Sequence, residues 1–358
     1  MFSLKKRNID KVRSIALDVS DPRSPTYGKH MSKEEVMALT HNPEALDAVK
    51  QYLERFDSSI TIDEITINGD YIHVRAPVEV WEKMFNAEFH HYRITHHDKS
   101  VEHFIRTEKY FLPIEIAGHV TGVFATTDMP LPKKKTHMSS IAEQRVINDK
   151  LRANAYDPTM LTALEFVYPA VINTVYNITS NIGSSSVSQA IYASIGQEYS
   201  TVDLKNFLSY FNIPSDSVDY VTSHQTKYCP DGSDCAESNL DVQYMMGVSQ
   251  QTPMTYYYTN KWWSWLSVVA NMTNPPDLFS ISYGAEEEYM SAAEMDAFDE
   301  EATILASMGI TLLAATGDDG APGSSVKNAY SCQYSPQWPA RYHLNPPSIY
   351  SVINLLAS

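Results

Sequence analysis

Residues 1–127 alternate between helical and strand-like patterns of apolar positions. Apolar side chains recur every three to four residues in segments starting at Ile9, Asn42-Pro43 and Pro77, and Ser32 to Glu35 reads as a capping box that opens another helix. Strands are predicted for FSL, SITIDEITI, DYIHVRA, FHHYRIT and VEHFIRT. The resulting order of strand, helix, strand, strand, helix and strand predicts an α+β domain with a ferredoxin-like fold.

Residues 128–156 are polar and carry no such pattern. Pro130, Pro132 and the run Lys133-Lys134-Lys135 predict an exposed linker between two domains. The basic triplet by itself is equally typical of a solvated charge run.

Strands and helices alternate in residues 157–358. Buried strands are predicted for VSQAIYASI, TPMTYYYT, LFSISYG and ITLLAATG, and helices for the segments from Ser200, from Lys261 and from Ala285 to Met308. This alternation predicts an α/β domain with a parallel sheet covered by helices on both faces. Function in such sheets collects in the loops after the strand ends, here Ala285-Glu286-Glu287 and the turn-like segment from Asp318 to Gly323.

One further helix is predicted to carry two carboxylates on the same face. In CPDGSDCAESNLDVQYMMG, Asp234 is the expected N-cap and Gly247 the expected stop, with apolar side chains at Leu240, Tyr244 and Met245. Glu237 and Asp241 are four residues apart, where like charges cost a helix about 0.2–0.5 kcal/mol. Two carboxylates that share a site raise the pKa of one of them, which suits proton transfer. The structural alternative is a capping box at Glu237 and a solvated Asp241.

Length and charge narrow the function classes. A chain of 358 residues predicts two domains. A net charge of −16 and a pI near 5.1 argue against nucleic acid and anionic membrane surfaces as partners, because both would repel the chain. No apolar run approaches the roughly 18–20 residues that span a bilayer, so no membrane span is expected.

Cysteines and sequons indicate an oxidising compartment. Cys229 and Cys235 lie close enough in sequence to close a short loop before the acidic helix, although three reduced thiols, with Cys332, are the alternative. Sequons start at Asn177 and Asn271. The first residues lack the apolar core of a secretory signal, so we expect that Met1 is not the natural N-terminus.

The segment ESNLDVQY resembles the E-x-x-L-D-x-Q-Y signature of the sedolisin family, the serine-carboxyl peptidases that include tripeptidyl peptidases. The resemblance implies that Glu237 is the general base and that Asp241 orients it. It also implies that residues 157–358 form part of a subtilisin-like catalytic domain. A carboxylate base fits an enzyme that works in acid, where imidazole would be protonated.

Residues 1–127 resemble the activation prodomain that precedes sedolisin catalytic domains. The similarity lies in LKKRN, VSDP, SPTYGKH and the segment from Ser32 to Val36. Such a prodomain templates its enzyme and blocks the cleft, so the resemblance implies a zymogen that is activated by cleavage within the linker 128–156.

The turn after ITLLAATG resembles the S-G-D-S-G-A segment of the family, with Thr316 and Asp319 in place of its serines. Asp318 would then help to form the oxyanion hole, and it can donate a hydrogen bond only while protonated. Ser280 to Gly284 resembles a strand that lines the substrate cleft. The family's nucleophile segment S-G-T-S-A-S and the calcium site after it are absent, and Ser324-Ser325 does not replace them.

These features predict an acid-active serine-type peptidase zymogen, lysosomal or secreted, acting on peptide or protein substrates and bound by its own prodomain. The chain is expected to be a fragment, inactive alone, of a protein whose full length binds calcium. The alternative is a non-catalytic relative that binds or inhibits a peptidase through its prodomain. A small-molecule enzyme on a doubly wound sheet is disfavoured because G-x-G-x-x-G and G-x-x-x-x-G-K-[ST] are missing.

Nine of the 12 histidines lie in the first domain. Adjacent histidines on a strand point to opposite faces, so a metal site is not expected there. One hypothesis is that protonation below about pH 6.5 weakens the hold of this domain on the enzyme. Replacing His90, His91, His96 and His97 would then shift the pH of self-activation, whereas solvated histidines would leave it unmoved.

Overall fold

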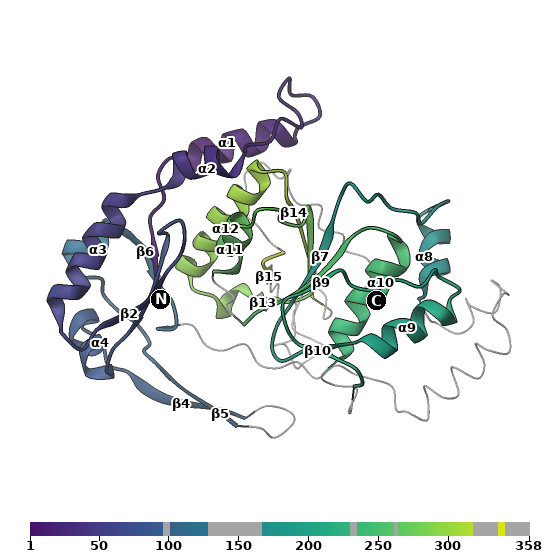
Figure 1. The fold of residues 1–358 in the computed structure, drawn as a ribbon. Helices are drawn as coiled ribbons and strands as arrows, with labels where there is room; N and C mark the ends of the chain where they lie inside the picture. The colour runs from purple at the N-terminus through teal and green to yellow at the C-terminus, as the bar shows by residue number, and fades with distance from the viewer. Residues whose placement is uncertain (96–100, 128–166, 230–234, 261–263, 318–335, 341–358) are drawn as a thin grey trace, which may run out of the picture. The chain divides into compact units, whose positions relative to one another are not determined.

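The structure is a computed structural model that describes residues 1–95, 101–127, 167–229, 235–260, 264–317 and 336–340. Its contacts divide the chain into two compact units (Figure 1). Unit 1 combines Met1–Lys133 with Thr259–Ser358, and unit 2 is Lys134–Tyr258. Residues 128–156 lie outside the described residues, so the predicted linker and domain boundaries stay a prediction.

Residues 1–127, here called the N-terminal domain, contain a four-stranded antiparallel sheet. The strands are β1 (Phe2–Leu4), β2 (Thr61–Ile65), β3 (Tyr71–Arg75) and β6 (Val120–Val123), in the order β2-β3-β1-β6. This is the strand order of a ferredoxin-like sheet, so the predicted α+β fold is confirmed.

The prediction that FHHYRIT and VEHFIRT close this sheet is wrong. β4 (His90–Thr95) and β5 (Val101–Arg106) pair with each other as a separate two-stranded sheet, and β6, which the sequence analysis did not predict, supplies the fourth strand. The reason is burial, because β4 alternates between exposed and half-buried residues whereas Val120, Gly122 and Val123 of β6 are buried.

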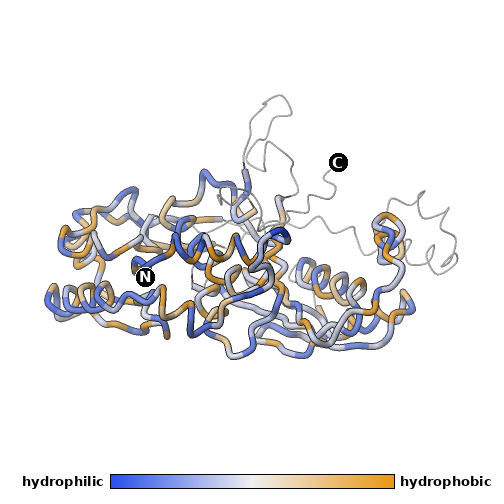
Figure 2. Tube along the Cα trace, turned by 90° about the horizontal axis from the view of Figure 1, so that it is seen from above, coloured by the Kyte–Doolittle hydropathy of each residue, from blue (hydrophilic) through white to orange (hydrophobic). Residues whose placement is uncertain are grey.

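The described part of the domain contains five helices, of which α3, α4 and α5 contribute to the core of the sheet, and apolar positions recur between hydrophilic ones along the chain (Figure 2). The Ser32–Glu35 capping box opens α2 as predicted, and Asn42 caps α3. The core gathers Phe2, Leu4, Val49, Leu53, Ile72 and Phe85. The helices are α1 (Ile9–Ser20), α2 (Lys33–Thr40), α3 (Pro43–Phe56), α4 (Val78–Phe85) and α5 (Ile114–Ala117).

The later part of unit 1 contains two parallel strands, β12 (Leu278–Ile281) and β14 (Thr311–Ala314). The predicted helix from Ala285 to Met308 begins later than expected, because Ala285–Glu286 (β13) pairs with Gln337–Trp338 (β15) and a 3-10 turn, η2 (Glu287–Tyr289), follows. A capping box between Ser291 and Glu294 then opens α12 (Ala292–Ser307). Gly309, at φ 89°, ends this region as predicted. The helix α11 (Trp265–Ala270) precedes β12.

The N-terminal domain packs on α12 within unit 1, where α1 and β6 lie against this helix (Figure 1). Tyr71 and Phe124 bury their rings with Ala297, and Ala293 adjoins them. Two polar contacts lie beyond this apolar patch: the Met31 amide donates to the Ser307 carbonyl at 2.9 Å, and Lys33 Nζ donates to the Asn271 carbonyl at 2.5 Å.

Unit 2 contains three parallel strands, β7 (Gln189–Ala193), β11 (Met254–Tyr258) and β9 (Tyr220–Val221), with β11 in the middle. Its helices are α8 (Pro169–Val175), α9 (Thr201–Tyr210) and α10 (Ala236–Val248), and a short parallel pair joins β8 (Tyr199–Ser200) to β10 (Gln225–Thr226). The core combines strand residues such as Ile191 and Tyr256 with Leu204, Leu208 and Val242 from the helices. Parallel strands that alternate with helices confirm the α/β class.

Gly122 tests the packing of β6 on α12. A Cβ added at Gly122 would lie 2.5 Å from the Ala293 Cβ, whereas nothing lies within 4 Å of a Cβ added at Gly118. Gly122→Ala should therefore lower the free energy of unfolding by about 1–3 kcal/mol through overpacking. Gly118→Ala should change it little. Urea unfolding of both variants checks this, and equal midpoints would show that β6 and α12 are not in contact.

Candidate active site

The helix α10 carries the two predicted site carboxylates, and its start is fixed covalently. Cys235 is the N-cap residue and forms a disulfide with Cys229, with 6.1 Å between their Cα atoms. The predicted cap Asp234 lies outside the described residues, and the cap is the next residue instead. The predicted stop at Gly247 is also wrong, because Gly247 is buried inside the helix, where an added Cβ would approach Phe207 at 3.2 Å.

Glu237 and Asp241 lie one helical turn apart on α10, and both are half-buried. The structure therefore brings them together, as the spacing predicts. The buried side of α10 includes Ser238, Val242 and Met246, which follow one another at intervals of four residues and therefore share one face of the helix. Leu240 is 51% exposed, which corrects the expectation that it points into the core.

A turn after β7 holds the first turn of α10. The Glu237 amide donates to Gln197 Oε1 at 3.2 Å. Tyr256, on β11, donates from its hydroxyl to the Gln197 carbonyl at 2.9 Å and lies 2.8 Å from Ser238 Oγ. Because the single tyrosine proton goes to Gln197, Ser238 must donate to Tyr256. The position of Glu237 is thus set by two neighbouring parallel strands.

Asn239 ties the same turn of α10 to the start of α9. Its side-chain oxygen accepts from the Ser200 amide at 2.8 Å, and its amide nitrogen donates to Asp203 Oδ2 at 3.1 Å. Ser200 in turn caps α9 by accepting from the Asp203 amide at 3.1 Å. Each of residues 237 to 239 therefore makes at least one hydrogen bond to a neighbouring segment, in addition to the apolar packing of the helix.

Glu198 is another acidic side chain near Tyr256, in addition to Asp241. Burial raises the pKa of Tyr256, and the negative charges of Asp241 and Glu198 raise it further. Glu198 is half-buried and directly follows Gln197 in the turn after β7. The sequence analysis missed Glu198, Gln197 and Tyr256, although the segment GQEYS directly after a predicted strand was the available signal.

The other predicted site residues belong to unit 1. Asp318 lies outside the described residues, which end in this region at Gly317, three residues after β14. Ser280 and Ile281 belong to β12, which runs parallel to β14 as expected for the cleft-lining strand. The oxyanion role of Asp318 therefore stays a prediction.

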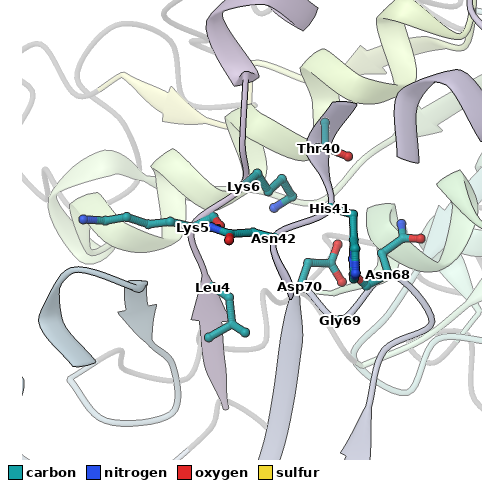
Figure 3. A pocket seen from close by; sticks show the side chains of 9 residues that line it. All are labelled: Leu4, Lys5, Lys6, Thr40, His41, Asn42, Asn68, Gly69 and Asp70. Carbon is teal, nitrogen blue, oxygen red and sulfur yellow. The ribbon is translucent and has the colours of Figure 1, made fainter. Parts of the chain in front are cut away.

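A small pocket opens elsewhere, and every residue that lines it belongs to the N-terminal domain (Figure 3). Lys6, His41 and Asp70 are its titratable members beside Lys5, and His41 Nδ1 lies 2.8 Å from the Asn68 carbonyl oxygen. It contains no residue of α10. Among the described residues, no group of three or more His, Cys, Asp or Glu side chains is placed to hold a metal ion.

Comparison with known proteins supports the family resemblance. The model of the Pro-kumamolisin activation domain matches residues 1–129. Tripeptidyl-peptidase 1 of Macaca fascicularis and that of Homo sapiens are each 29% identical to the chain over 361 residues, and that of Dictyostelium discoideum is 24% identical over 367 residues. These alignments cover 95% of this chain and 59% of each relative, so the chain spans about three fifths of their length.

A solved structure of Pseudomonas sedolisin, a serine-carboxyl proteinase complexed with two molecules of pseudo-iodotyrostatin, is 20% identical and covers 48% of this chain and 50% of its own, with a TM-score of 0.39. The activation-domain match and the similarity to tripeptidyl peptidases agree with the motifs in residues 1–36 and 237–244. Residues 1–129 match the activation domain of pro-kumamolisin, and the chain as a whole is similar to tripeptidyl-peptidase 1, which supports the resemblance to the sedolisin family.

Proposed function

We propose that the protein is the zymogen of an acid-active serine-carboxyl peptidase, with residues 1–127 as prodomain and residues 157–358 within the catalytic domain. The observation that carries the proposal is the pair Glu237 and Asp241, half-buried on one face of a helix whose first turn is anchored to two strand ends. The similarity to tripeptidyl peptidases supports the same reaction class, hydrolysis of peptide bonds. Tripeptidyl release and internal cleavage are both open to such a site.

Glu237 is proposed as the general base. In its ionised form it would accept the proton of a serine hydroxyl and later return a proton to the leaving amine. Asp241, one turn away, would orient the Glu237 carboxyl by sharing a proton with it. Asp318, while protonated, would donate a hydrogen bond to the oxyanion.

The compartment proposed for the protein is lysosomal or extracellular. The Cys229–Cys235 disulfide supports this, because disulfides persist in oxidising compartments. No helix among the described residues is long and apolar enough to cross a membrane.

Calcium is expected for the full-length family. The described residues offer no cluster of acidic side chains that fits a metal ion. The proposal therefore assigns calcium no step and no ligand within the described residues.

Replacing the proposed base tests this function. In the full-length natural protein, Glu237→Gln should lower kcat by at least about 100-fold at acid pH, because an amide cannot accept the proton. The assay compares a fluorogenic substrate with a free N-terminal tripeptide and an internally quenched peptide blocked at its N-terminus, so it also separates exopeptidase from endopeptidase activity.

Glu288→Gln is the matched control, since Glu288 is exposed and lies outside the proposed site. It should leave kcat unchanged. Full activity of Glu237→Gln would contradict the role of Glu237. Absence of hydrolysis by the unaltered protein would favour instead a relative that binds peptidases through its prodomain.

Tyr256→Phe tests how the base is held in place. The change removes the hydroxyl that donates to the Gln197 carbonyl and that contacts the buried Ser238 hydroxyl, so the free energy of unfolding should fall by about 1–3 kcal/mol. Tyr228→Phe is the control, because Tyr228 is 60% exposed. Urea unfolding of the 358-residue chain measures both, and equal stability of the two variants would show that the hydroxyl does not anchor α10.

A further inference from the structure

The contact between the N-terminal domain and helices α11 and α12 contains a buried cluster of one cation and three acids. Lys6 Nζ lies 2.9 Å from Glu301 Oε1 and 3.3 Å from Glu300 Oε2. The Lys6 and Glu301 side chains are 3% and 1% exposed, and that of Glu300 is 18% exposed. Asp70, from the β2–β3 turn, is 7% exposed and completes the cluster. Lys5, the neighbour of Lys6, extends away from it (Figure 3).

Both carboxylate oxygens of Asp70 accept hydrogen bonds from hydroxyl groups. Its Oδ2 accepts from Ser267 Oγ of α11 at 2.9 Å, and its Oδ1 accepts from Thr66 Oγ1. The hydroxyl of Ser267 belongs to the later part of the chain, so Asp70 is held this way only when the N-terminal domain is docked on α11.

The acidic groups of the cluster outnumber its single cation, so one of them is expected to bind a proton. Lys6 carries one positive charge, whereas Asp70, Glu300 and Glu301 would carry three negative charges if all were ionised. Burying unbalanced charge costs several kcal/mol per ion, so one of the acids is expected to be neutral. Glu301 is the most buried of the three and is hydrogen-bonded to Asp70, which needs one proton between the two carboxyl groups.

We propose that Glu301 and Asp70 share one proton, carried by Glu301, while the N-terminal domain is docked on α11 and α12, and that docking takes up this proton from solution. The ionic contacts of Lys6 are then with Glu300 and the shared acid pair, and the buried cluster holds one excess negative charge instead of two. This inference concerns the docking contact and does not depend on the proposed peptidase activity.

The electrostatics of the groups around Glu301 agree with this assignment. Burial, with a further contribution from the charge and hydrogen bond of Asp70, raises the pKa of Glu301 from its usual 4.5 to about 8, and Lys6 opposes the rise. Tyr71 and Glu300 are the other titratable groups at the cluster, and the pKa values of Lys6 and Tyr71 are both raised well above their usual ones. On the same helix, burial raises the pKa of Asp299 to about 8, with Arg13 of α1 opposing.

The sign of the pH dependence follows from this raised pKa. A carboxyl whose pKa is higher in the docked state binds more protons there, so its contribution to docking is complete below about pH 4.5 and disappears as the pH rises through about 8. Mild acid would therefore tighten this contact. The histidine protonation that the sequence analysis proposes would weaken the same contact in acid, so the two effects would oppose each other.

Glu301→Gln in the 358-residue chain tests the proposal, because glutamine imitates the neutral acid. At about pH 4 its thermal midpoint should match that of the unaltered chain, and its excess over the unaltered chain should grow with pH to about 3–6 °C at about pH 9. Glu79→Gln is the control, since Glu79 lies exposed on α4, and it should keep the pH dependence of the unaltered chain. Asp299→Asn measures separately the share of the pH dependence that Asp299 supplies.

The opposite result would overturn the proposal. If Glu301 were the ionised partner of Lys6, glutamine would leave a buried ammonium poorly paired, and the midpoint would fall at about pH 6 as well as at about pH 9. Carbon NMR of the Glu301 carboxyl in the unaltered chain is the second measurement. A titration near pH 8 supports the shared proton, and an ionised carboxyl throughout pH 5–9 refutes it.

Discussion

The burial of the Lys6 ammonium against α12 is the interaction on which unit 1 depends. Lys6 lies 294 residues from Glu300 along the chain, yet its side chain is 3% exposed and its Nζ lies 3.3 Å from Glu300 and 2.9 Å from Glu301. Separating a buried ammonium from its acidic neighbours leaves an uncompensated charge, which is costly, so the N-terminal domain and α12 resist separation in their folded form. The close approach of Gly122 to Ala293 and the apolar patch around Tyr71 add shape complementarity to the same contact.

This contact gives a physical basis for treating the N-terminal domain and residues 259–358 as one packed unit. The division of the chain by contacts groups residues 1–133 with residues 259–358 rather than with their nearest neighbours in sequence. The buried hydroxyl of Ser267 on α11 donates to Asp70 of the N-terminal domain, so this polar contact forms only when that domain is docked. A template that completes such polar contacts would favour the folded arrangement of these helices.

The proposed catalytic helix follows a related principle at shorter range. The first turn of α10 is held by the Cys229 disulfide, by Gln197 and by Tyr256, so its carboxylates are positioned by backbone-directed polar contacts. Such anchoring limits the movement of a general base, and proton transfer depends on that geometry. Leu240 can consequently remain exposed beside Glu237 and Asp241 without loosening the helix.

The sequence by itself determined the features that neighbouring residues encode. The Ser32–Glu35 capping box, the buried strand β7, the ferredoxin-like order and the shared face of Glu237 and Asp241 all follow from periodicity and caps within short segments. Tertiary structure alone decided that β6 closes the sheet, that Tyr256 and Gln197 hold Glu237, and that Lys6 meets Glu301. These depend on which distant surfaces bury one another, and a local pattern of apolar and polar residues carries no information about the partner of a polar side chain.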